Sequence, residues 1–324
     1  MSTSFSFSRY RRPIVVSLVL LVALALFPVI DLLILSSQVQ KANFAKPSGE
    51  DSDTWLLVAS DSRENAPHEI LQKNDIQEYG ERADLIFLAR RAGDKLIVAA
   101  LPRDIDVVYQ NNPRNRLTLM LTFGPTRLNA AVCNDLGIPA GHYLQLDMNG
   151  FVNLTDAVGG LEVELAHPMR DRDTKLNLKE GKQTLSGKQA LAFVRARSYQ
   201  ELIDDKWQDV APGKGANMRI EHSKMAIQQI KRKLRTSKNP FVWRKAIWSV
   251  GKDAKIDEYS SWRDLLTLVR GEIVSQTIDT EIVSADSLHR RLTPKGIKQL
   301  EELGFKKPCR LPYGETTTDP NVAG

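Results

Sequence analysis

Cysteine is scarce in this chain of 324 residues, which contains only Cys133 and Cys309. Neither belongs to a C-x-x-C or Cys/His pattern, so a disulfide-dense scaffold and a zinc ribbon receive no support. The five histidines form no H-E-x-x-H and no G-x-S-x-G elbow occurs, so zinc protease and serine hydrolase chemistry are unsupported as well. At most one disulfide can form in an exported domain, and two separate thiols are the alternative.

Strong charge imbalance is also absent. Lys and Arg number 45 against 39 Asp and Glu, which gives a net charge of +6. This favours anionic partners but does not by itself indicate nucleic acid. With 42% apolar and 26% charged residues the chain falls in the globular range, so a disordered or collagen-like chain is ruled out. The length is a soft indication of about two domains.

One long uncharged run stands near the start, from Pro13 to Ile30, and a second apolar stretch follows Asp31. Its length suits the roughly 20 residues that span a bilayer core. Arginines before the run favour a cytoplasmic N-terminus, so the rest of the chain is expected outside the cytoplasmic membrane. A cleavable signal peptide is the alternative, but the run is longer than about 15 residues and no convincing A-x-A site follows.

These features predict an order of segments along the chain. It consists of a cytoplasmic N-terminus (1–12), a single transmembrane anchor (13–36), a polar linker (37–53), a catalytic domain (54–285) and a partly disordered C-terminal extension (286–324).

Short apolar runs separated by turns predict the fold of the exported part. Strands are expected at 55–60, 85–90, 95–101 and 161–165, and helices at 129–136, 151–158, 186–193 and 219–235. Ala92-Gly93-Asp94 joins two strands as a hairpin, and Ser186 is the expected N-cap of its helix. The first three strands are nearly continuous apolar runs, which is typical of strands buried on both faces. We therefore predict a three-layer α/β/α domain with a central mixed sheet.

Residues 206–255 carry an excess of positive charge. They hold thirteen Lys or Arg and three Asp or Glu, so this region is +10 while the rest of the chain sums to −4. A solvated basic face is one interpretation, and contact with anionic lipid or wall polymer is the other.

Aspartate and arginine gather at the ends of the predicted strands. The clusters are Asp61-Ser62-Arg63, Arg82-Ala83-Asp84, Pro102-Arg103-Asp104, Arg195-Ala196-Arg197 and Arg219. Arginine forks bind phosphate oxygens bidentately, and carboxylates hold Mg²⁺, so the combination suits a pyrophosphate. A network of Asp–Arg salt bridges closing the sheet edge is the alternative.

Several segments, in this order, resemble one known family. They are LLVASDSR (56–63), ERADLIFLAR (81–90), LPRDIDV (101–107), RLNAA (127–131), DMNGFVNLTDAVGGLEVEL (147–165) and LSGKQALAFVRARS (185–198). This pattern is similar to that of the LytR-CpsA-Psr family, over roughly residues 54–235 and more weakly to about 285.

The resemblance implies a single-pass, outward-facing α/β/α enzyme whose apolar channel holds a polyprenyl tail and whose mouth holds a pyrophosphate with Mg²⁺, Mn²⁺ being the alternative ion. Such an enzyme transfers a phosphorylated glycopolymer from a polyprenyl-pyrophosphate carrier onto peptidoglycan and forms a phosphodiester. The partners implied are this lipid-linked donor, the peptidoglycan acceptor and the membrane, without nucleic acid.

The resemblance also assigns roles to individual residues. Asp61 and Asp84 match the magnesium-binding aspartates. The matched pyrophosphate-contacting arginines are Arg63, Arg82, Arg103, Arg195 and Arg197, with Arg219 a further match on the long helix. Of these, Arg103, Arg195 and Arg197 are also candidate catalytic residues. Asp104 follows Arg103 as in the family and is the candidate general base; holding Arg103 is its alternative role.

The sequence departs from the family pattern where His222 and Ser223 replace a common Arg and Gln and where Ala59 replaces a common glycine. The stretch between Arg197 and Arg219 is also longer than usual. Two other functions therefore stay open, hydrolysis of the same pyrophosphate and non-catalytic binding of wall or lipid.

Overall fold

The computed structural model describes residues 39–47, 53–62, 81–109, 112–196, 198–210, 212–269, 272–283 and 289–312. The predicted anchor, Arg63 and Arg197 lie outside these ranges. Within them, none of the helices combines the length and apolar character needed to cross a bilayer.

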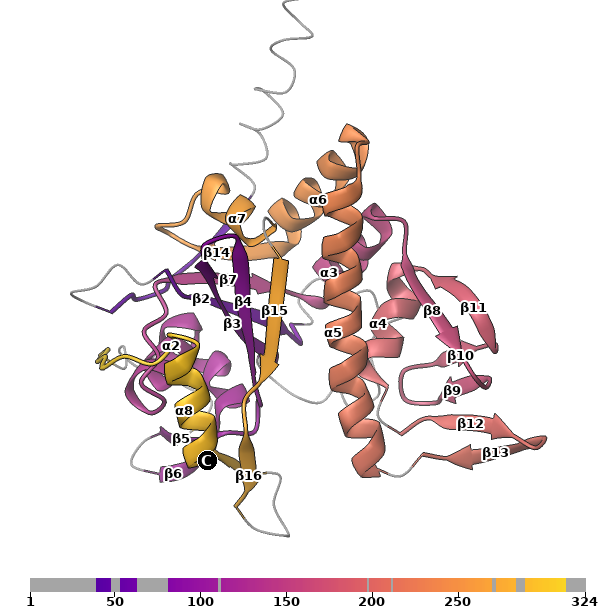
Figure 1. Ribbon diagram of the computed structural model, residues 1–324, viewed down its shortest axis with the longest axis horizontal. Helices are drawn as coiled ribbons and strands as arrows, with labels where there is room; N and C mark the ends of the chain where they lie inside the picture. The colour runs from indigo at the N-terminus through magenta and orange to yellow at the C-terminus, as the bar shows by residue number, and fades with distance from the viewer. Residues whose placement is uncertain are drawn as a thin grey trace, which may run out of the picture.

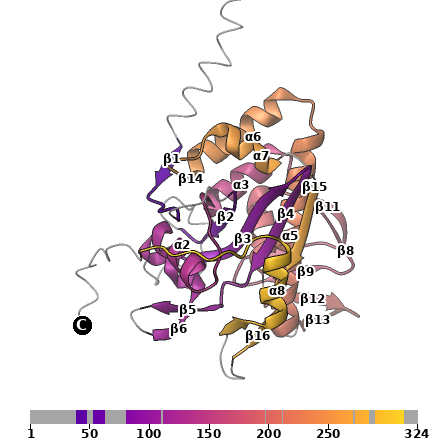
Figure 2. The same cartoon turned by 60° about the vertical axis from the view of Figure 1, so that its left-hand side comes forward.

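A seven-stranded mixed sheet forms the centre of the molecule (Figures 1 and 2). Its strands, in spatial order, are β1 (Gln40–Ala42), β14 (Ala254–Asp257), β7 (His142–Leu146), β2 (Trp55–Ser60), β3 (Ala83–Ala92), β4 (Lys95–Leu101) and β15 (Glu272–Thr277). The predicted hairpin is confirmed, since Ala92 pairs with Lys95 across a turn in which Gly93 has φ of 60°. That positive φ is a conformation that glycine adopts without a steric penalty.

Side chains alternate along each strand, so both faces of this sheet carry apolar residues, and helices cover both faces. On one face Leu56 and Val58 join a core built with η3 (Leu117–Phe123), α2 (Pro125–Asn134) and α8 (Pro294–Glu302). On the other, Trp55 and Leu57 pack with Leu265 of α7 (Trp262–Val269). The expectation of a mixed central sheet with covering helices is thus confirmed.

The second face is also bordered by α3 (Met148–Ala157), α5 (Pro212–Thr236) and α6 (Pro240–Asp253). The long helix starts seven residues before the predicted Arg219, with a proline at its first position, where no intrahelical N–H bond is lost. Ile227, Ile230 and Leu234 recur at helical spacing, which predicts that all three face the core. Ile230 and Leu234 are buried among α3 and α6 as predicted, whereas Ile227 is 37% exposed.

A side lobe of small sheets packs beyond α5. It contains β8 (Leu161–Leu165) paired with β11 (Gly181–Leu185), and a four-stranded sheet of β9 (Met169–Asp171), β10 (Leu176–Leu178), β12 (Gln200–Ile203) and β13 (Lys206–Asp209). The predicted strand at 161–165 is confirmed, although it lies outside the central sheet. The helix α4 (Gly187–Arg195) packs against α3 and α5. Ser186 and Gln189 form a capping box at its start, so the predicted N-cap is confirmed.

Two short hairpins complete the described part, β5 (Asp106–Tyr109) with β6 (Asn112–Arg116) and β16 (Thr280–Ile282) with β17 (Arg290–Leu292). In both views they lie at the end of the molecule opposite α6 and α7 (Figures 1 and 2).

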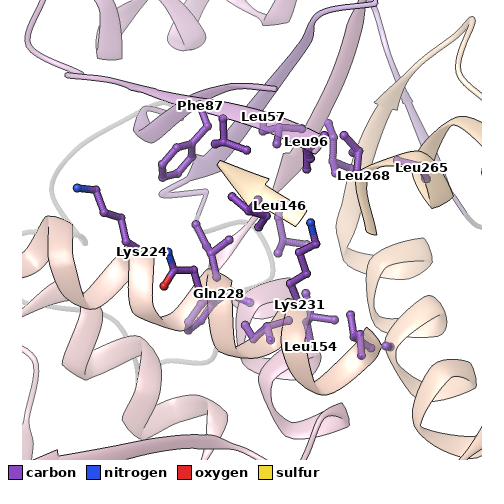
Figure 3. Close-up of a pocket in the computed structure, with 18 of the residues that line it drawn as sticks. Leu57, Phe87, Leu96, Leu146, Leu154, Lys224, Gln228, Lys231, Leu265 and Leu268 are labelled. Carbon is purple, nitrogen blue, oxygen red and sulfur yellow. The ribbon is translucent and has the colours of Figure 1, made fainter. Parts of the chain in front are cut away.

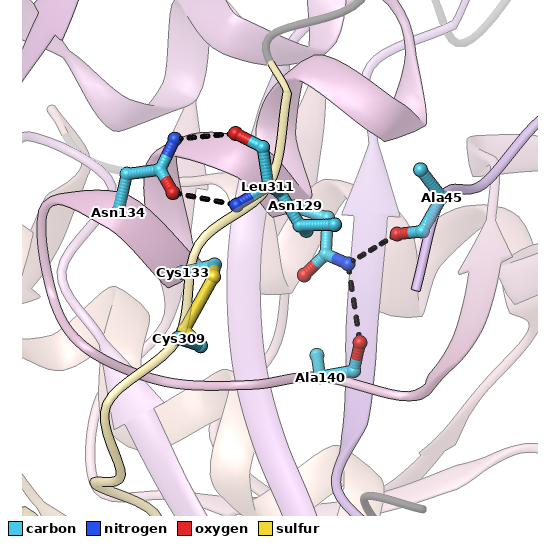
Figure 4. The surroundings of a disulfide bond; sticks show 7 residues. All are labelled: Ala45, Asn129, Cys133, Asn134, Ala140, Cys309 and Leu311. Atoms are coloured by element: carbon cyan, nitrogen blue, oxygen red, sulfur yellow. Dashed lines mark hydrogen bonds between the residues drawn. A yellow bond between two sulfur atoms is a disulfide. The ribbon is translucent and has the colours of Figure 1, made fainter. Parts of the chain in front are cut away.

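The two cysteines form a disulfide that ties the segment after α8 to α2 (Figure 4). Their Cα atoms lie 5.6 Å apart. Next to the bridge, Asn134 donates to the Leu311 carbonyl and accepts from its N–H, both at 2.8 Å. Of the two arrangements that the sequence left open, the structure has the disulfide.

Replacing both cysteines with serine is expected to lower the free energy of unfolding by about 3–5 kcal/mol, because the cross-link closes a long loop and restricts the unfolded chain. Urea unfolding of the oxidised protein and of the Cys133→Ser/Cys309→Ser variant measures the difference. The unmodified chain unfolded with reductant is the control and should match the variant. Equal midpoints for the oxidised chain and the variant would contradict this role.

Candidate functional site

Three strand ends meet at one edge of the central sheet. β3 runs antiparallel to both β2 and β4, so the start of β3 lies beside the ends of its two neighbours. Asp61 follows β2, Asp84 is the second residue of β3, and Arg103 and Asp104 follow β4. The hydrogen bonding of the strands therefore brings together residues from three of the five clusters that the sequence singled out.

Asp61 is the buried member of this group, with 2% of its surface exposed. Its carboxylate accepts from the Arg82 backbone N–H at 2.6 Å and from Nε and Nη2 of the same residue at 3.0 Å each. Burial raises the pKa of Asp61, the Arg82 backbone N–H opposes the rise, and the nearby Asp84 carboxylate adds to it. Asp61 and Asp84 are thus close enough to repel each other.

Arg103 connects two aspartates. Its Nη1 contacts Oδ1 of Asp84, and its Nε lies 3.7 Å from Oδ2 of Asp104. Asp104 also lies 3.4 Å from Nη1 of Arg116. These ion pairs fix the guanidinium of Arg103. Asp104 thus makes the contact that is needed to hold Arg103, which is its alternative to acting as general base.

Backbone contacts hold the same edge in place from η3. The Thr118 N–H donates to the Arg103 carbonyl at 2.9 Å, and its hydroxyl donates to the Ala83 carbonyl at 2.8 Å. Since Thr118 is 2% exposed, water does not compete for these bonds. The end of β4 and the start of β3 are therefore joined independently of the ion pairs.

A polar pocket of about 600 Å³ opens beside these residues. Its polar lining includes Asp84, Arg103, Asp104, Arg219, Ser223, Asp279, Arg290 and Lys295. The structure thus brings Arg219 of α5 to the same pocket as the residues after β4. Arg290 and Lys295, which lie in the region predicted as the C-terminal extension, are pocket residues that the sequence did not predict. The Thr293-Pro294 start of α8 is the sequence signal that could have placed Lys295 in an ordered helix.

An apolar pocket of about 320 Å³ adjoins the polar pocket, and Phe87 lines both. It lies between the sheet and α5 and is bordered by α6 and α7 (Figure 3). Its lining includes Leu57, Phe87, Leu96, Leu146 and Leu154, with Ile227 of α5 and Leu265 and Leu268 of α7.

Few polar side chains enter the apolar pocket. Lys224, Gln228 and Lys231 reach it from α5. The Nζ atom of Lys231 is buried without a hydrogen-bond partner among the described residues. Burial lowers the pKa of Lys231, and the positive charges of Arg235 and Arg91 lower it further. The space beside the sheet is thus an apolar cavity with a cationic side chain along its helical wall.

Arg195 takes a different position. It is the last residue of α4 and lines a third pocket, of about 200 Å³, with Lys175, Lys188 and others. Among the described residues that line the polar pocket, Arg195 does not appear. Its contact with the same phosphates stays a prediction, as do the roles of Arg63 and Arg197.

The two departures from the family pattern on α5 have local explanations. The ring of His222 stacks on Phe193 of α4 with centroids 3.9 Å apart, and only 8% of the residue is exposed. Burial lowers the pKa of His222, and a hydrogen bond with the Phe193 backbone offsets part of this decrease. The Ser223 hydroxyl donates to the Arg219 carbonyl at 2.8 Å and also lines the polar pocket. His222 therefore serves the packing of α4 on α5.

The carboxylate oxygens of Asp61 and Asp84 are the kind of ligand that suits a divalent cation which shares its coordination with a bound substrate. In the described ranges no group of three or more His, Cys, Asp or Glu is placed to hold a metal ion alone. Mg²⁺ usually takes one or two protein carboxylates and completes its shell with water and phosphate oxygens. The mutual repulsion of Asp61 and Asp84 would be offset by such an ion.

Fold and site together define an α/β protein in which a cationic pocket adjoins an apolar one. The model of the LytR_cpsA_psr family matches residues 35–279, and the chain belongs to this family. The resemblance found in the sequence is thereby confirmed.

Relatives with curated names include the probable cell wall biosynthesis protein LcpB of Corynebacterium glutamicum, 33% identical over 44% of this chain and 36% of LcpB. The polyisoprenyl-teichoic acid–peptidoglycan teichoic acid transferase TagU of Halalkalibacterium halodurans is 28% identical over 48% of this chain and 49% of its own. The matches thus span about a third to a half of these relatives' lengths.

Solved structures share the fold. The LytR-Csp2A-Psr enzyme from Actinomyces oris has a TM-score of 0.70 and 26% identity, covering 84% of this chain and 98% of its own. TagT bound to LI-WTA has a TM-score of 0.55 at 17% identity, covering 82% and 97%, which supports the fold alone.

The lowered pKa of His222 predicts a pH dependence of stability. Below the ordinary pKa of 6.5 the unfolded chain binds a proton at this histidine while the folded chain resists it, so the free energy of unfolding falls with falling pH. The His222→Phe variant, which keeps an aromatic ring against Phe193, should lose this part of the dependence.

Urea unfolding between about pH 5 and 8 measures this effect, since unperturbed histidine titrates in that range. His167→Gln, at an exposed histidine, is the matched control and should follow the unmodified chain. Identical slopes for the His222→Phe variant and the unmodified chain would contradict the assignment.

Proposed function

We propose that this chain is a membrane-anchored transferase that moves a phosphorylated glycopolymer from a polyprenyl-pyrophosphate carrier to peptidoglycan outside the cytoplasmic membrane. The observation that supports it most is that the cationic pocket and the apolar pocket are neighbours that share Phe87 in their linings. A diphosphate with an isoprenoid tail has the same division into an anionic part and an apolar part.

The polar pocket supplies the charge for a diphosphate. Arg103, Arg219, Arg290 and Lys295 are cationic groups in its lining, and guanidinium groups bind phosphate oxygens in fixed bidentate geometry. Positive charge held in place before the reaction stabilises the charge that develops on the leaving polyprenyl phosphate. Because Asp84 and Asp104 already orient Arg103, its alignment costs little when substrate binds.

Asp61 and Asp84 are the residues that would hold Mg²⁺ together with phosphate oxygens. When bound, the ion would neutralise charge on the diphosphate. The proposed transfer forms a bond between an acceptor hydroxyl oxygen and the phosphorus linked to the glycopolymer, and it breaks the bridging P–O bond. The proton of the hydroxyl passes to a base, for which Asp104 is the proposed residue, and polyprenyl phosphate leaves.

The apolar pocket is the proposed site of the isoprenoid tail. Leucines of the sheet face Ile227 of α5 across it. Burial of apolar tail surface contributes about 25 cal/mol per Å², so the tail supplies binding energy away from the reacting phosphorus.

Replacing Arg103 with glutamine tests the cationic pocket. We expect kcat/KM for transfer to fall at least about 100-fold, because a preorganised donor to developing charge is lost. The assay uses a synthetic polyprenyl-diphosphate-linked disaccharide, isolated peptidoglycan and Mg²⁺, and follows both the labelled sugar on peptidoglycan and the release of polyprenyl phosphate.

Arg291→Gln is the matched control for this experiment. Arg291 follows Arg290 in β17 but pairs on the surface with Glu281, and 65% of its side chain is exposed, so its loss should leave the rate nearly unchanged. Full transfer by Arg103→Gln would contradict the proposal. Release without acceptor would indicate a pyrophosphatase, and donor binding without any product a binding protein.

The Ser275→Trp variant tests whether the apolar pocket binds the isoprenoid tail. Ser275 lies on the exposed edge strand β15 and lines the pocket. Its replacement by Trp would occupy tail space and is expected to weaken binding of a long-chain polyprenyl diphosphate on the order of tenfold, equivalent to about 1.4 kcal/mol. Inorganic pyrophosphate, which has no tail, should bind as before.

The matched control is Val274→Trp, one residue away on the opposite face of the same strand and 39% exposed. Isothermal titration of both variants with the two ligands measures the effect. Equal weakening of both ligands, or no difference between the two variants, would contradict a tail in this pocket.

A further inference from the structure

The exposed face of α6 combines aromatic and cationic side chains. Phe241, Arg244, Lys245 and Trp248 follow the spacing i, i+3, i+4, i+7, which places them on one side of the helix. Phe241 is 69% exposed, the largest exposure of any large hydrophobic residue in the described part of the chain. The Arg244 guanidinium lies 5.3 Å from the ring centroid of Trp248.

The other side of α6 is committed to the core. Ala246 is 3% exposed and packs with Val242 and Trp243 against Ile230 and Leu234 of α5. Helix propensity and core packing therefore do not account for a phenylalanine at 241, since that position contributes nothing to the buried side. An amphipathic helix of this composition, with aromatic and basic residues on its outer face, is typical of helices at membrane surfaces.

The charge around this face has one sign. From His222 to Lys252 the sequence holds nine Lys and Arg and no Asp or Glu. Lys233 is engaged by Glu162 of β8, whereas the exposed Arg235 and Lys238 extend the positive surface from α6 onto the end of α5. We call the set Arg235, Lys238, Phe241, Arg244 and Lys245 the basic corner.

The position of the basic corner matches the predicted anchor. Val39, the first described residue, follows the predicted end of the anchor by three residues, a span of at most about 11 Å at 3.6 Å per residue. It directly precedes β1, and α6 packs against β1 and β14. In both views β14, α6 and α7 gather at one end of the molecule, away from β16 and α8, and Figure 2 shows β1 beside β14 at the same end (Figures 1 and 2).

We propose that the basic corner docks on an anionic phospholipid bilayer. Arg235, Lys238, Arg244 and Lys245 approach the lipid phosphates, while Phe241 enters the interfacial region. Docking fixes the orientation of the domain beyond what a single-pass anchor and its short connection to β1 would impose. The polar pocket, lined from β16, β17 and α8, then points away from the bilayer toward the wall.

Docking also places the rim of the apolar pocket at the lipid surface. Trp243, Ala246 and Ile247 of α6 line that pocket, as do Leu265 and Leu268 of α7. An apolar chain would pass from the bilayer into the pocket beneath α6 with little exposure to water. This consequence rests on the proposed function, whereas docking itself does not require any transfer reaction.

The test uses the full chain in nanodiscs, without donor or acceptor. A single cysteine introduced by Phe241→Cys carries an environment-sensitive dye, and nitroxide-labelled lipid serves as the quencher. Phe123→Cys is the matched control, because Phe123 is also an exposed phenylalanine, 44% exposed, on η3 at the other end of the molecule. Nanodiscs contain either phosphatidylcholine alone or phosphatidylcholine with phosphatidylglycerol.

We expect severalfold stronger quenching at 241 than at 123 in anionic nanodiscs, and a loss of this difference in neutral ones. Adding Arg244→Gln/Lys245→Gln to the labelled chain should reduce the ratio of docked to undocked molecules on the order of tenfold or more, since each near-surface cation contributes about 1 kcal/mol. Lys182→Gln/Lys206→Gln, at two exposed lysines of the side lobe, should leave the ratio unchanged.

Equal quenching at 241 and 123 in anionic nanodiscs would overturn the proposal. So would quenching at 241 that the Arg244/Lys245 charge variant leaves unchanged. Protection of the dye by added teichoic acid polymer without lipid quenching would assign the basic corner to a wall polymer instead. Because no step measures transfer, an inactive enzyme with a docked corner would leave this inference intact.

Discussion

The arrangement of the site depends on the pairing of the Asp61 and Asp84 carboxylates with guanidinium groups where β2, β3 and β4 meet. Asp61 is removed from water, and an ionised carboxylate there is tolerated because Arg82 supplies a backbone N–H and two side-chain donors. Arg82 directly precedes β3 and Asp84 lies just inside it, so the same strand fixes the second carboxylate, which in turn orients Arg103 after β4. The position of the arginine at the polar pocket is therefore a consequence of strand pairing and desolvation together.

The apolar pocket follows from how α5 divides its faces. Ala226, Ile230 and Leu234 turn toward α3, α4 and α6, where they are buried. Lys224, Ile227, Gln228 and Lys231 face the sheet, and this mixed surface cannot close onto the leucines opposite without burying two ammonium groups. The side chains between α5 and the sheet thus keep the two apart, and the leucines of the sheet form an apolar wall of the pocket.

Much of the local structure could be predicted from the sequence. Continuous apolar runs bounded by turn residues located β2 and β4, and the capping residues Ser186 and Gln189 located the start of α4. Asp61, Asp84 and Arg103 are predictable as candidates because charged residues at the ends of apolar strands can be recognised one cluster at a time. That these three share an edge depends on the antiparallel pairing of β3, which apolar runs do not specify.

What could not be predicted depends on tertiary contacts without a local signal. Ile227 has the same periodicity as its buried neighbours, and only the position of the sheet decides that it lines a cavity. Arg290 and Lys295 reach the polar pocket because Arg290 bonds through its backbone to Asp104 and because α8 packs on the sheet. The pairing of Cys133 with Cys309 likewise requires knowing that the segment after α8 returns to α2.

Two groups of cationic side chains lie near opposite ends of the apolar pocket. Arg103, Arg219, Arg290 and Lys295 surround the polar pocket at one end, and the basic corner lies at the other. The proposed donor has a single anionic head group, so its binding requires cationic side chains only around that head group. A second group of cations at the far end, on a helix whose outer face carries Phe241, is therefore in excess of what the donor requires. The extra cations of the basic corner are explained if this end of the domain meets a second anionic surface. An anionic bilayer is such a surface, and docking on it would place the apolar pocket next to the lipid interior.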